Sequence, residues 1–203
     1  MRWLQNKAPV PRFVSYYEDD TKEYLCLTYI EGEPASDYNS KDTEESVGYL
    51  VGRTLRELHQ LPINECPFNT FTPTKLVDQV EENIGKFPEQ VVDAAKKTFP
   101  NESLDMLMNF LHHNRPPMDK WVFTHGDYGT GNVIIRNGKV EAFIDLDGAG
   151  ISDPYYDIYY MIKSLTVYSH RHDQVSEFLR GYGIKELDCN AYKFHHIVDT
   201  LLL

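Results

Sequence analysis

The sequence predicts an α+β protein in which helices surround a small central β-hairpin. Apolar residues recur at helical spacing in the first third, the middle and the last quarter of the chain, which indicates amphipathic helices. Residues 121–124 are typical of a short strand, and 132–136 and 139–145 of two more. Asn137-Gly138 joins the last two, and this dipeptide favours a two-residue type I′ hairpin turn. Helices and strands are therefore segregated along the chain, which favours an α+β over a parallel α/β arrangement.

The first thirty residues predict a pair of strands. Val10-Pro11 leads into an apolar and aromatic run at 13–17, the acidic turn 18–20 follows, and a second run covers 23–30. Residues 31–42 are polar and contain Gly, Pro, Ser and Asn, so they indicate a linker.

A helix is expected after this linker, from a capping-box-like start at Asp42 with Glu45 three residues later. Its apolar residues are Val47, Leu50, Val51, Leu55 and Leu58. Residues 73–114 contain three weaker helical patterns. After Pro154 the chain is helical again, and Asp153 is expected to cap that helix with Pro154 at the first helical position.

Composition limits the classes of function. The chain has 203 residues, enough for one domain, and a net charge of −11, which argues against a nucleic-acid-binding surface. Cys26, Cys66 and Cys189 are widely spaced and form no C-x-x-C pair, so we expect reduced thiols rather than a zinc knuckle or a disulfide scaffold. The sequence contains no apolar run long enough to span a membrane and no signal-peptide pattern at its start, so a cytoplasmic protein is expected.

One segment has the pattern of a phosphoryl-transfer catalytic loop, His-x-Asp-x-x-x-x-Asn. It begins with His125-Gly126-Asp127, and Asn132 follows Asp127 by five positions. Asp145 follows Asn132 by thirteen positions, at the end of the predicted hairpin. A metal-binding Asp after such a loop belongs to the same arrangement. The spacing therefore predicts a site for phosphoryl transfer.

The residue types suit that chemistry. A loop between two strands can hold Asp127 where an acceptor hydroxyl arrives, so that its carboxylate orients the hydroxyl and takes up its proton. Asn132 offers a neutral oxygen and Asp145 a charged one, and both are hard ligands suited to Mg²⁺ that bridges nucleotide phosphates. The hairpin brings the end of its second strand beside the start of its first, so these two residues can meet across it.

Several neighbours of this loop have simpler interpretations. His125 is expected to pack and to hydrogen-bond the loop rather than to act as a base. Gly129 and Gly131 precede a strand instead of a helix N-terminus, so they do not form a glycine-rich phosphate cradle. Asp147 fits either a second carboxylate toward the metal or a turn residue, and Asp157 points back toward the loop only if its helix packs there.

This motif, with the following Asp153-Pro154-Tyr155-Tyr156-Asp157-Ile158, resembles the aminoglycoside phosphotransferase family. These small-molecule kinases are related in fold to protein kinases and choline kinases. Three further segments are similar to family segments: Trp3-Leu4 with Val10-Pro11 before the hinge strand, Leu27 to Gly32 at the hinge and its exit, and Leu55 to His59 at the end of a helix. The pattern resembles above all the enzymes that phosphorylate a sugar 3′-hydroxyl.

The resemblance implies a protein-kinase-like fold, in which residues 1–32 would be a remnant of the N-terminal lobe with the hinge strand and 33–203 the helical C-lobe. It implies ATP and Mg²⁺ as cofactors. Asp127 would be the catalytic residue, and Asn132 and Asp145 would be the magnesium ligands.

It also implies binding residues for both substrates. The backbone of Thr28 and Ile30 would meet the adenine edge. Asp157 would lie in an acidic acceptor pocket, with Asp199 and the carboxylate of Leu203 as further anions for ammonium groups. The acceptor would be a polycationic aminoglycoside, bound by charge-assisted hydrogen bonds and inactivated as an antibiotic.

The sequence departs from the family pattern in two places. Residues 163–168 contain no acidic side chain where the 3′-hydroxyl enzymes carry several. No glycine-rich turn and no V-A-I-K-like strand precede the hinge, and Lys7 and Lys22 lie near turns and do not replace the phosphate-binding Lys. The resemblance is therefore to an N-terminally truncated member, for which very weak activity is expected.

Other functions remain open from the sequence. A non-catalytic remnant or binding module would leave the hinge strand exposed and favour a homodimer. A kinase for another small hydroxylated metabolite would use the same residues. A metallohydrolase would use the same carboxylates, but it needs several His ligands, and only His125 is close in sequence.

Overall fold

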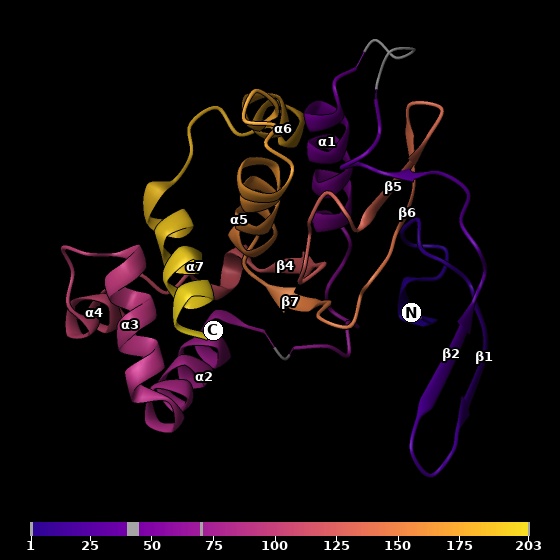
Figure 1. Ribbon diagram of the computed structural model, residues 1–203. Coiled ribbons are helices and arrows are strands. Elements are labelled where there is room, and N and C mark those ends of the chain that lie inside the picture. Colours follow the sequence, from indigo (N-terminus) through magenta and orange to yellow (C-terminus); the bar gives the residue numbers. More distant parts are fainter. Residues whose placement is uncertain (1, 40–44, 70, 203) are drawn as a thin grey trace. The chain divides into compact units, whose positions relative to one another are not determined.

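The computed structural model describes residues 2–39, 45–69 and 71–202 (Figure 1). Its contacts divide the chain into two compact units. The first unit consists of Met1–Leu61, Asp127–Gly148 and Tyr160–Lys185, and the second of Pro62–Gly126, Ala149–Tyr159 and Glu186–Leu203. The division into lobes at residue 32 stays a prediction, because these units follow contacts rather than the order of the chain.

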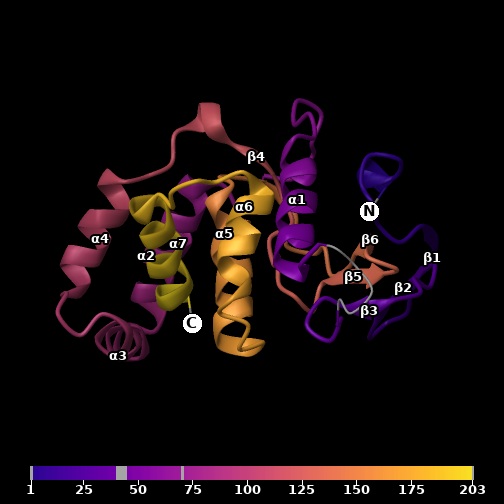
Figure 2. The ribbon, with the colours of Figure 1, turned by 90° about the horizontal axis from the view of Figure 1, so that it is seen from above.

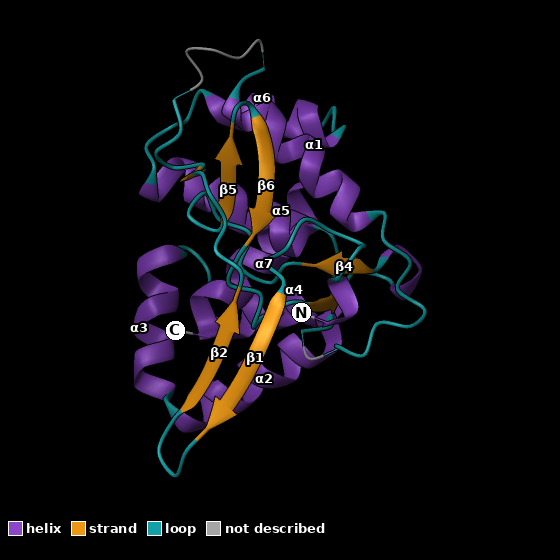
Figure 3. Ribbon diagram, turned by 90° about the vertical axis from the view of Figure 1, so that its right-hand side faces the viewer, coloured by secondary structure: helices purple, strands orange, loops and turns teal. Residues whose placement is uncertain are grey.

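In the first unit a short 3-10 helix (Arg2–Leu4) precedes an antiparallel ribbon of β1 (Phe13–Glu18) and β2 (Glu23–Leu27). Figure 3 shows this ribbon as a long two-stranded element. The predicted strand pair is confirmed, although the second strand ends at Leu27 rather than at residue 30. The ribbon exposes five large apolar side chains, Val14, Tyr16, Tyr17, Tyr24 and Leu25. The expected homodimer stays a prediction.

The second sheet of this unit contains the predicted hairpin. β5 (Val133–Arg136) pairs with β6 (Lys139–Phe143), and β3 (Glu33–Pro34) pairs with the other edge of β5. Asn137 has φ 50° and Gly138 has φ 72°. A type I′ turn requires positive φ at both central residues, so the predicted turn is confirmed.

The helix α1 (Val47–His59) begins one turn later than expected. Its N-cap is Ser46, whose hydroxyl accepts the N–H of Tyr49 at 3.2 Å. The predicted capping box is therefore wrong: Glu45 lies before the cap, and Asp42 lies outside the described residues. Ser46 caps the helix because its hydroxyl reaches an N–H group of the first turn, and Ser is a preferred residue at the N-cap position.

The helices α1 and α6 (Gln174–Tyr182) lie side by side (Figures 1 and 2). Glycines allow the backbones to approach closely, because a Cβ added to Gly52 would lie 2.1 Å from the carbonyl oxygen of Phe178. Leu50, Val51 and Leu55 are buried on α1. Hence this pair of helices forms much of the core of the first unit.

The second unit contains the three helices predicted over residues 73–114. They are α2 (Pro73–Lys86), α3 (Pro88–Thr98) and α4 (Leu104–His113), and α7 (Cys189–Leu202) packs with them (Figure 2). A short 3-10 helix (Met118–Lys120) leads to β4 (Val122–Thr124), which pairs with β7 (Gly150–Ser152).

The helix α5 (Tyr155–Lys163) follows β7 and continues into a π-helix (Ser164–Tyr168). Its first five residues belong to the second unit and the remainder to the first. None of the helices in the described part of the chain is long and apolar enough to cross a membrane.

Candidate active site

The loop after β4 presents the carboxylate of Asp127 to solvent. The side-chain amide of Asn132 donates through Nδ2 to Asp127 Oδ2 at 3.0 Å and to the Asp127 carbonyl at 2.9 Å. Gly129 donates its N–H to the same carbonyl at 2.8 Å. These bonds fix the loop and turn the Asn132 amide so that Oδ1, the atom a cation would bind, faces away from Asp127.

The β5–β6 hairpin connects Asn132 with the segment that holds Asp145. Ile144 donates its N–H to the Asn132 carbonyl at 3.0 Å, and Asp145 is the next residue. Asp145 is exposed and has φ 58°, a left-handed conformation that is uncommon for residues other than glycine and concentrates at functional sites. The backbone hydrogen bond between Ile144 and Asn132 therefore brings Asn132 close to Asp145, as predicted for the two ends of the hairpin.

The donor set fits magnesium better than zinc. An amide oxygen and a carboxylate are hard oxygen ligands, which suit Mg²⁺ when nucleotide phosphates complete the coordination. Among the described residues, no group of three or more His, Cys, Asp or Glu is placed to hold a metal ion. The roles of Asn132 and Asp145 as magnesium ligands stay predictions.

Asp157 points back toward the loop that carries Asp127, which is one of its two expected positions, rather than into an acceptor pocket. Its carboxylate is fully buried, and its two oxygens accept the backbone N–H groups of His125 at 2.7 Å and Gly126 at 2.9 Å. A buried carboxylate that is already bonded to two amides cannot meet a dissolved acceptor, so its prediction as an acceptor-pocket residue is corrected. It holds the two residues directly before Asp127, and His125 is itself fully buried.

A second buried carboxylate supports the start of α5. Asp153 accepts the N–H of Tyr155 at 3.1 Å, as predicted for a capping residue, and its other oxygen contacts Nε2 of the buried His195. The contact with His195 joins residues 42 positions apart, and nothing in the local sequence indicates it.

Tyr128, the residue after Asp127, anchors the loop from its other side. Its ring is fully buried against Phe143, and its hydroxyl donates to the carbonyl of Val51 in α1 at 2.9 Å. The residue that follows the exposed Asp127 is therefore fixed in the core, which limits the motion of the loop.

The hinge residues lie just past β2. Thr28 donates its N–H to the Arg12 carbonyl at 2.9 Å, and its hydroxyl accepts the Arg12 N–H at 2.9 Å. The N–H of Thr28 is thus used within the ribbon, which leaves its carbonyl oxygen as the group for an adenine amino group. The adenine-binding roles of Thr28 and Ile30 stay predictions.

A pocket of about 560 Å³ opens beside Asp127 within the first unit. Its lining residues come from the segment after β3, the catalytic loop, and α5 with the π-helix: Ser36, Asp37, Asp127, Gly129, Thr130, Gly131, Asn132, Tyr160, Ser164, Tyr168 and Ser169. Of these residues, the sequence predicts a function only for Asp127 and Asn132. The others carry no motif, and the pattern of hydroxyl groups becomes visible only in the fold.

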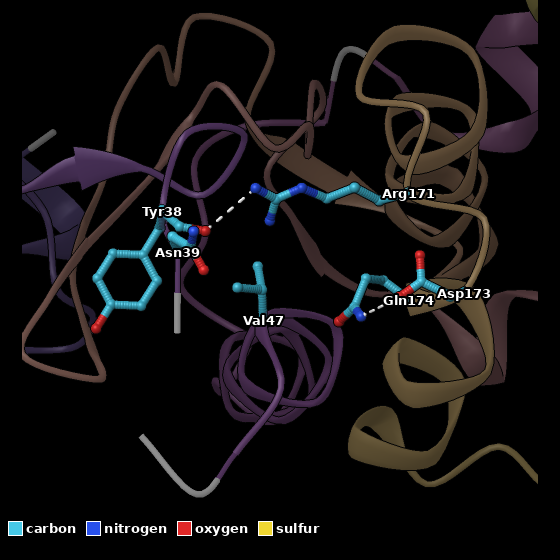
Figure 4. Close-up of a pocket in the computed structure, with 6 residues that line it drawn as sticks. All are labelled: Tyr38, Asn39, Val47, Arg171, Asp173 and Gln174. Carbon is cyan, nitrogen blue, oxygen red and sulfur yellow. Dashed lines mark hydrogen bonds between the residues drawn. The ribbon is translucent and has the colours of Figure 1, made fainter. Parts of the chain in front are cut away.

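Arg171 connects two of the segments that line this pocket. Its guanidinium donates to the carbonyls of Ala35 and Tyr38, both at 3.2 Å, on either side of Ser36 and Asp37. Figure 4 shows its bond to the Tyr38 carbonyl in a neighbouring pocket of about 250 Å³. The arginine thereby connects the segment after β3 with the residues that follow the π-helix.

Comparison with known proteins identifies the family. A family model described as a phosphotransferase enzyme family matches residues 1–195. The chain belongs to this family of phosphotransferases. The prediction from the catalytic motif and the segment around Asp157 is therefore confirmed at the level of the family.

Curated relatives of this phosphotransferase are aminoglycoside 3′-phosphotransferases. That of Niallia circulans is 31% identical over 98% of this chain and 75% of its own length, and that of Enterococcus faecalis is 27% identical over 99% and 76%. Among solved structures, an aminoglycoside 3′-phosphotransferase of type VIII has a TM-score of 0.78 at 23% identity, covering 98% of this chain and 77% of that chain. The α+β, kinase-like fold predicted from the sequence is thus confirmed.

Another solved structure is APH(3″)-Id from Streptomyces rimosus in complex with ADP and streptomycin. Its TM-score is 0.76 at 24% identity, and the match covers 99% of this chain and 79% of that chain. This likeness shows the shared fold.

One predicted acceptor-binding residue of the phosphotransferase, Asp199, lies in the helix α7. Asp199 is half-buried and accepts the hydroxyl of Tyr159 at 2.7 Å. Burial and the negative charge of Asp199 raise the pKa of the neighbouring Tyr192. Leu203 lies outside the described residues, so the roles of Asp199 and of the terminal carboxylate stay predictions.

Proposed function

We propose that this chain is an ATP-dependent O-phosphotransferase that transfers the γ-phosphoryl group to a hydroxyl of a small, cationic acceptor of the aminoglycoside type. One observation carries the proposal: the exposed carboxylate of Asp127 is held by Asn132 at the edge of a pocket of about 560 Å³. The relatives named as aminoglycoside 3′-phosphotransferases support the reaction type and the acceptor class. ATP as phosphoryl donor favours a cytoplasmic protein.

Asp127 would act on the acceptor. Its carboxylate would accept a hydrogen bond from the acceptor hydroxyl and take the proton as that oxygen bonds to phosphorus and the bond to ADP breaks. Buried groups on both sides limit its motion, because Asp157 holds the two preceding amides and Tyr128 follows in the core. Such positioning lowers the entropy lost in reaching the transition state.

Asn132 and Asp145 would hold Mg²⁺, which neutralises phosphate charge when bound. The Nδ2–Asp127 hydrogen bond would keep Oδ1 of Asn132 turned toward the ion. At the hinge, the Thr28 carbonyl and the Ile30 N–H would meet adenine, since the Thr28 N–H already donates to Arg12.

Mass spectrometry of the products tests the proposal. The chain is incubated with Mg-ATP and a panel of aminoglycosides, in parallel with the Asp127→Ala variant. We expect phosphorylated product with the wild type and none with the variant. Binding of Mg-ATP without any product would favour a binding module instead, and equal product with both proteins would remove Asp127 from the reaction.

A further inference from the structure

A buried pair of polar side chains joins the start of α5 to the helix α7. Nε2 of His195 contacts Oδ2 of Asp153, and both side chains are shielded from water. Neither belongs to the described residues that line the pocket beside Asp127. Taking a carboxylate and an imidazole out of water is costly, so packing alone does not account for this pair.

The ring of His195 has a defined orientation. It packs against the rings of Tyr156 and Phe194, whose centroids lie 5.5 and 5.1 Å from its own. Its Nδ1 is buried and has no hydrogen-bond partner among the described residues. A proton on Nδ1 would be a buried donor without an acceptor. The arrangement therefore favours the tautomer that carries its proton on Nε2 and donates it to Asp153.

Asp153 uses its two carboxylate oxygens for different purposes. Oδ1 accepts the N–H of Tyr155 at 3.1 Å and caps the first turn of α5, while Oδ2 faces His195. Capping needs only one side-chain oxygen, and Ser or Asn would cap as well. The second oxygen fixes the rotation of the carboxylate. With it, the contact fixes the point at which the first turn of α5 begins.

This first turn also contains Asp157, which follows Asp153 by four residues. The buried carboxylate of Asp157 accepts the N–H groups of His125 and Gly126, and Asp127 is the next residue along the chain. A rotation or shift of the first turn would therefore move the two amides that precede the exposed carboxylate.

We propose that His195 is a positioning residue for Asp127, the catalytic carboxylate. Through Asp153 it fixes the first turn of α5, and Asp157 transmits that position to the loop. This inference rests on the proposed function, because it takes Asp127 as the group that meets the acceptor hydroxyl. Since His195 and Asp153 do not line the pocket, they set the turnover rate rather than the binding of either substrate.

Two amide side chains of different length test the hold of His195 on Asp153. His195→Gln places a side-chain N–H close to the position of Nε2 and can still donate to Asp153, whereas His195→Asn is one methylene shorter and does not reach it. We expect His195→Asn to lower kcat about tenfold while the KM values of the acceptor and of Mg-ATP change by less than about twofold. His195→Gln should restore kcat to within about threefold of the wild type.

Amide hydrogen exchange follows the same hold without any turnover. We expect exchange at His125 and Gly126 to be about tenfold faster in His195→Asn than in the wild type, and close to the wild type in His195→Gln. In a protein that already carries Asp157→Asn, adding His195→Asn should lower kcat by less than about threefold, because the hold of Asp157 on the loop is already weakened. Fully additive losses of kcat would overturn the route through Asp157.

His59→Gln controls for a loss of stability. His59 is another buried histidine, and its Nδ1 contacts the hydroxyl of Tyr182 at 2.8 Å within the first unit. Gln reaches the position of Nε2 instead of Nδ1, so this contact is lost. The variant should lower the free energy of unfolding but leave kcat and the exchange at His125 and Gly126 unchanged. An equal fall of kcat in His59→Gln and His195→Asn would overturn the positioning role.

Asp153→Ser carries the test even where His195→Asn fails to fold, since Ser is a preferred N-cap but lacks the oxygen that faces His195. It should lower kcat and speed exchange at the two loop amides, and wild-type values of both would overturn the proposal. Faster exchange in these variants of a protein whose wild type forms no product would support the hold on the loop and overturn the proposed function instead.

Discussion

Replacing Asp157 by Asn should destabilise the protein and slow the proposed reaction, although Asp157 does not line the pocket. The carboxylate is fully buried and accepts two backbone N–H groups, at 2.7 and 2.9 Å. Asn keeps the shape and one acceptor oxygen, but its NH₂ group would face the other N–H. One charge-assisted bond is lost and two buried donors, the backbone N–H and the new NH₂ group, face each other, which costs about 2 kcal/mol.

Urea unfolding and amide hydrogen exchange measure this effect. We expect Asp157→Asn to lower the free energy of unfolding by about 2 kcal/mol and to speed exchange selectively at the amide of His125 or Gly126. The turnover rate should fall while the acceptor KM stays nearly constant, because Asp127 follows directly after the two released amides.

Asp188→Asn is the matched control. Asp188 also accepts two backbone N–H groups, from Asn190 at 3.0 Å and Ala191 at 3.1 Å, but both bond to one oxygen of an exposed side chain. Asn can keep both bonds, so the loss should stay below about 0.5 kcal/mol. Equal losses in the two variants, or unchanged exchange at His125 and Gly126, would show that burial of the Asp157 carboxylate does not set the cost.

Three further predictions concern packing, pH and metal. Gly52→Ala should lower the melting temperature by several degrees, because the new Cβ would lie 2.1 Å from a carbonyl oxygen of α6, whereas Gly85→Ala, which meets open space in α2, should raise it slightly. Burial and the charge of Asp199 raise the pKa of Tyr192 in the folded protein above its value of about 10 in the unfolded chain. The neutral Tyr192 therefore contributes its full share to the free energy of unfolding below pH about 10, and this share is lost as the pH rises through the pKa of the folded state. Tyr192→Phe should therefore lose less stability between pH 9 and 11 in urea unfolding, and an identical loss would contradict this. Asp145→Asn should raise the Mg²⁺ concentration for half-maximal transfer about tenfold or more, measured by magnesium titration of the rate, and an unchanged titration would exclude it as a ligand.

Local signals predict much of this fold. The turn at Asn137-Gly138 was predictable because two adjacent residues determine it, and the helices between 73 and 113 because their apolar stripes repeat along ten or more residues. The strands β3 and β7 contain two and three residues, too few to show a period, and their partners are remote in sequence.

Local sequence signals likewise predict some residues of the candidate site, whereas the positions of others depend on the fold. Asp127, Asn132 and Asp145 were predictable because one short segment contains all three at a characteristic spacing. For Asp157 the sequence leaves two positions open, because a carboxylate that binds a ligand and one that binds buried amides look alike in a sequence. The hydroxyl of Thr130 shares hydrogen bonds with the hydroxyls of Ser164 and Ser169, which lie 34 and 39 positions later at the start and just past the end of a π-helix that propensity does not predict.

The role of Asp127 as the base is tested most directly by the single-turnover rate of γ-phosphoryl transfer from labelled ATP to an acceptor hydroxyl. The wild type is compared with Asp127→Asn, which keeps the shape of the side chain and loses the base, and with Asp119→Asn, an exposed carboxylate in the 3-10 helix before β4. We expect a rate about 10² to 10⁴ times lower for Asp127→Asn and an unchanged rate for Asp119→Asn. Equal rates for the wild type and Asp127→Asn would contradict it.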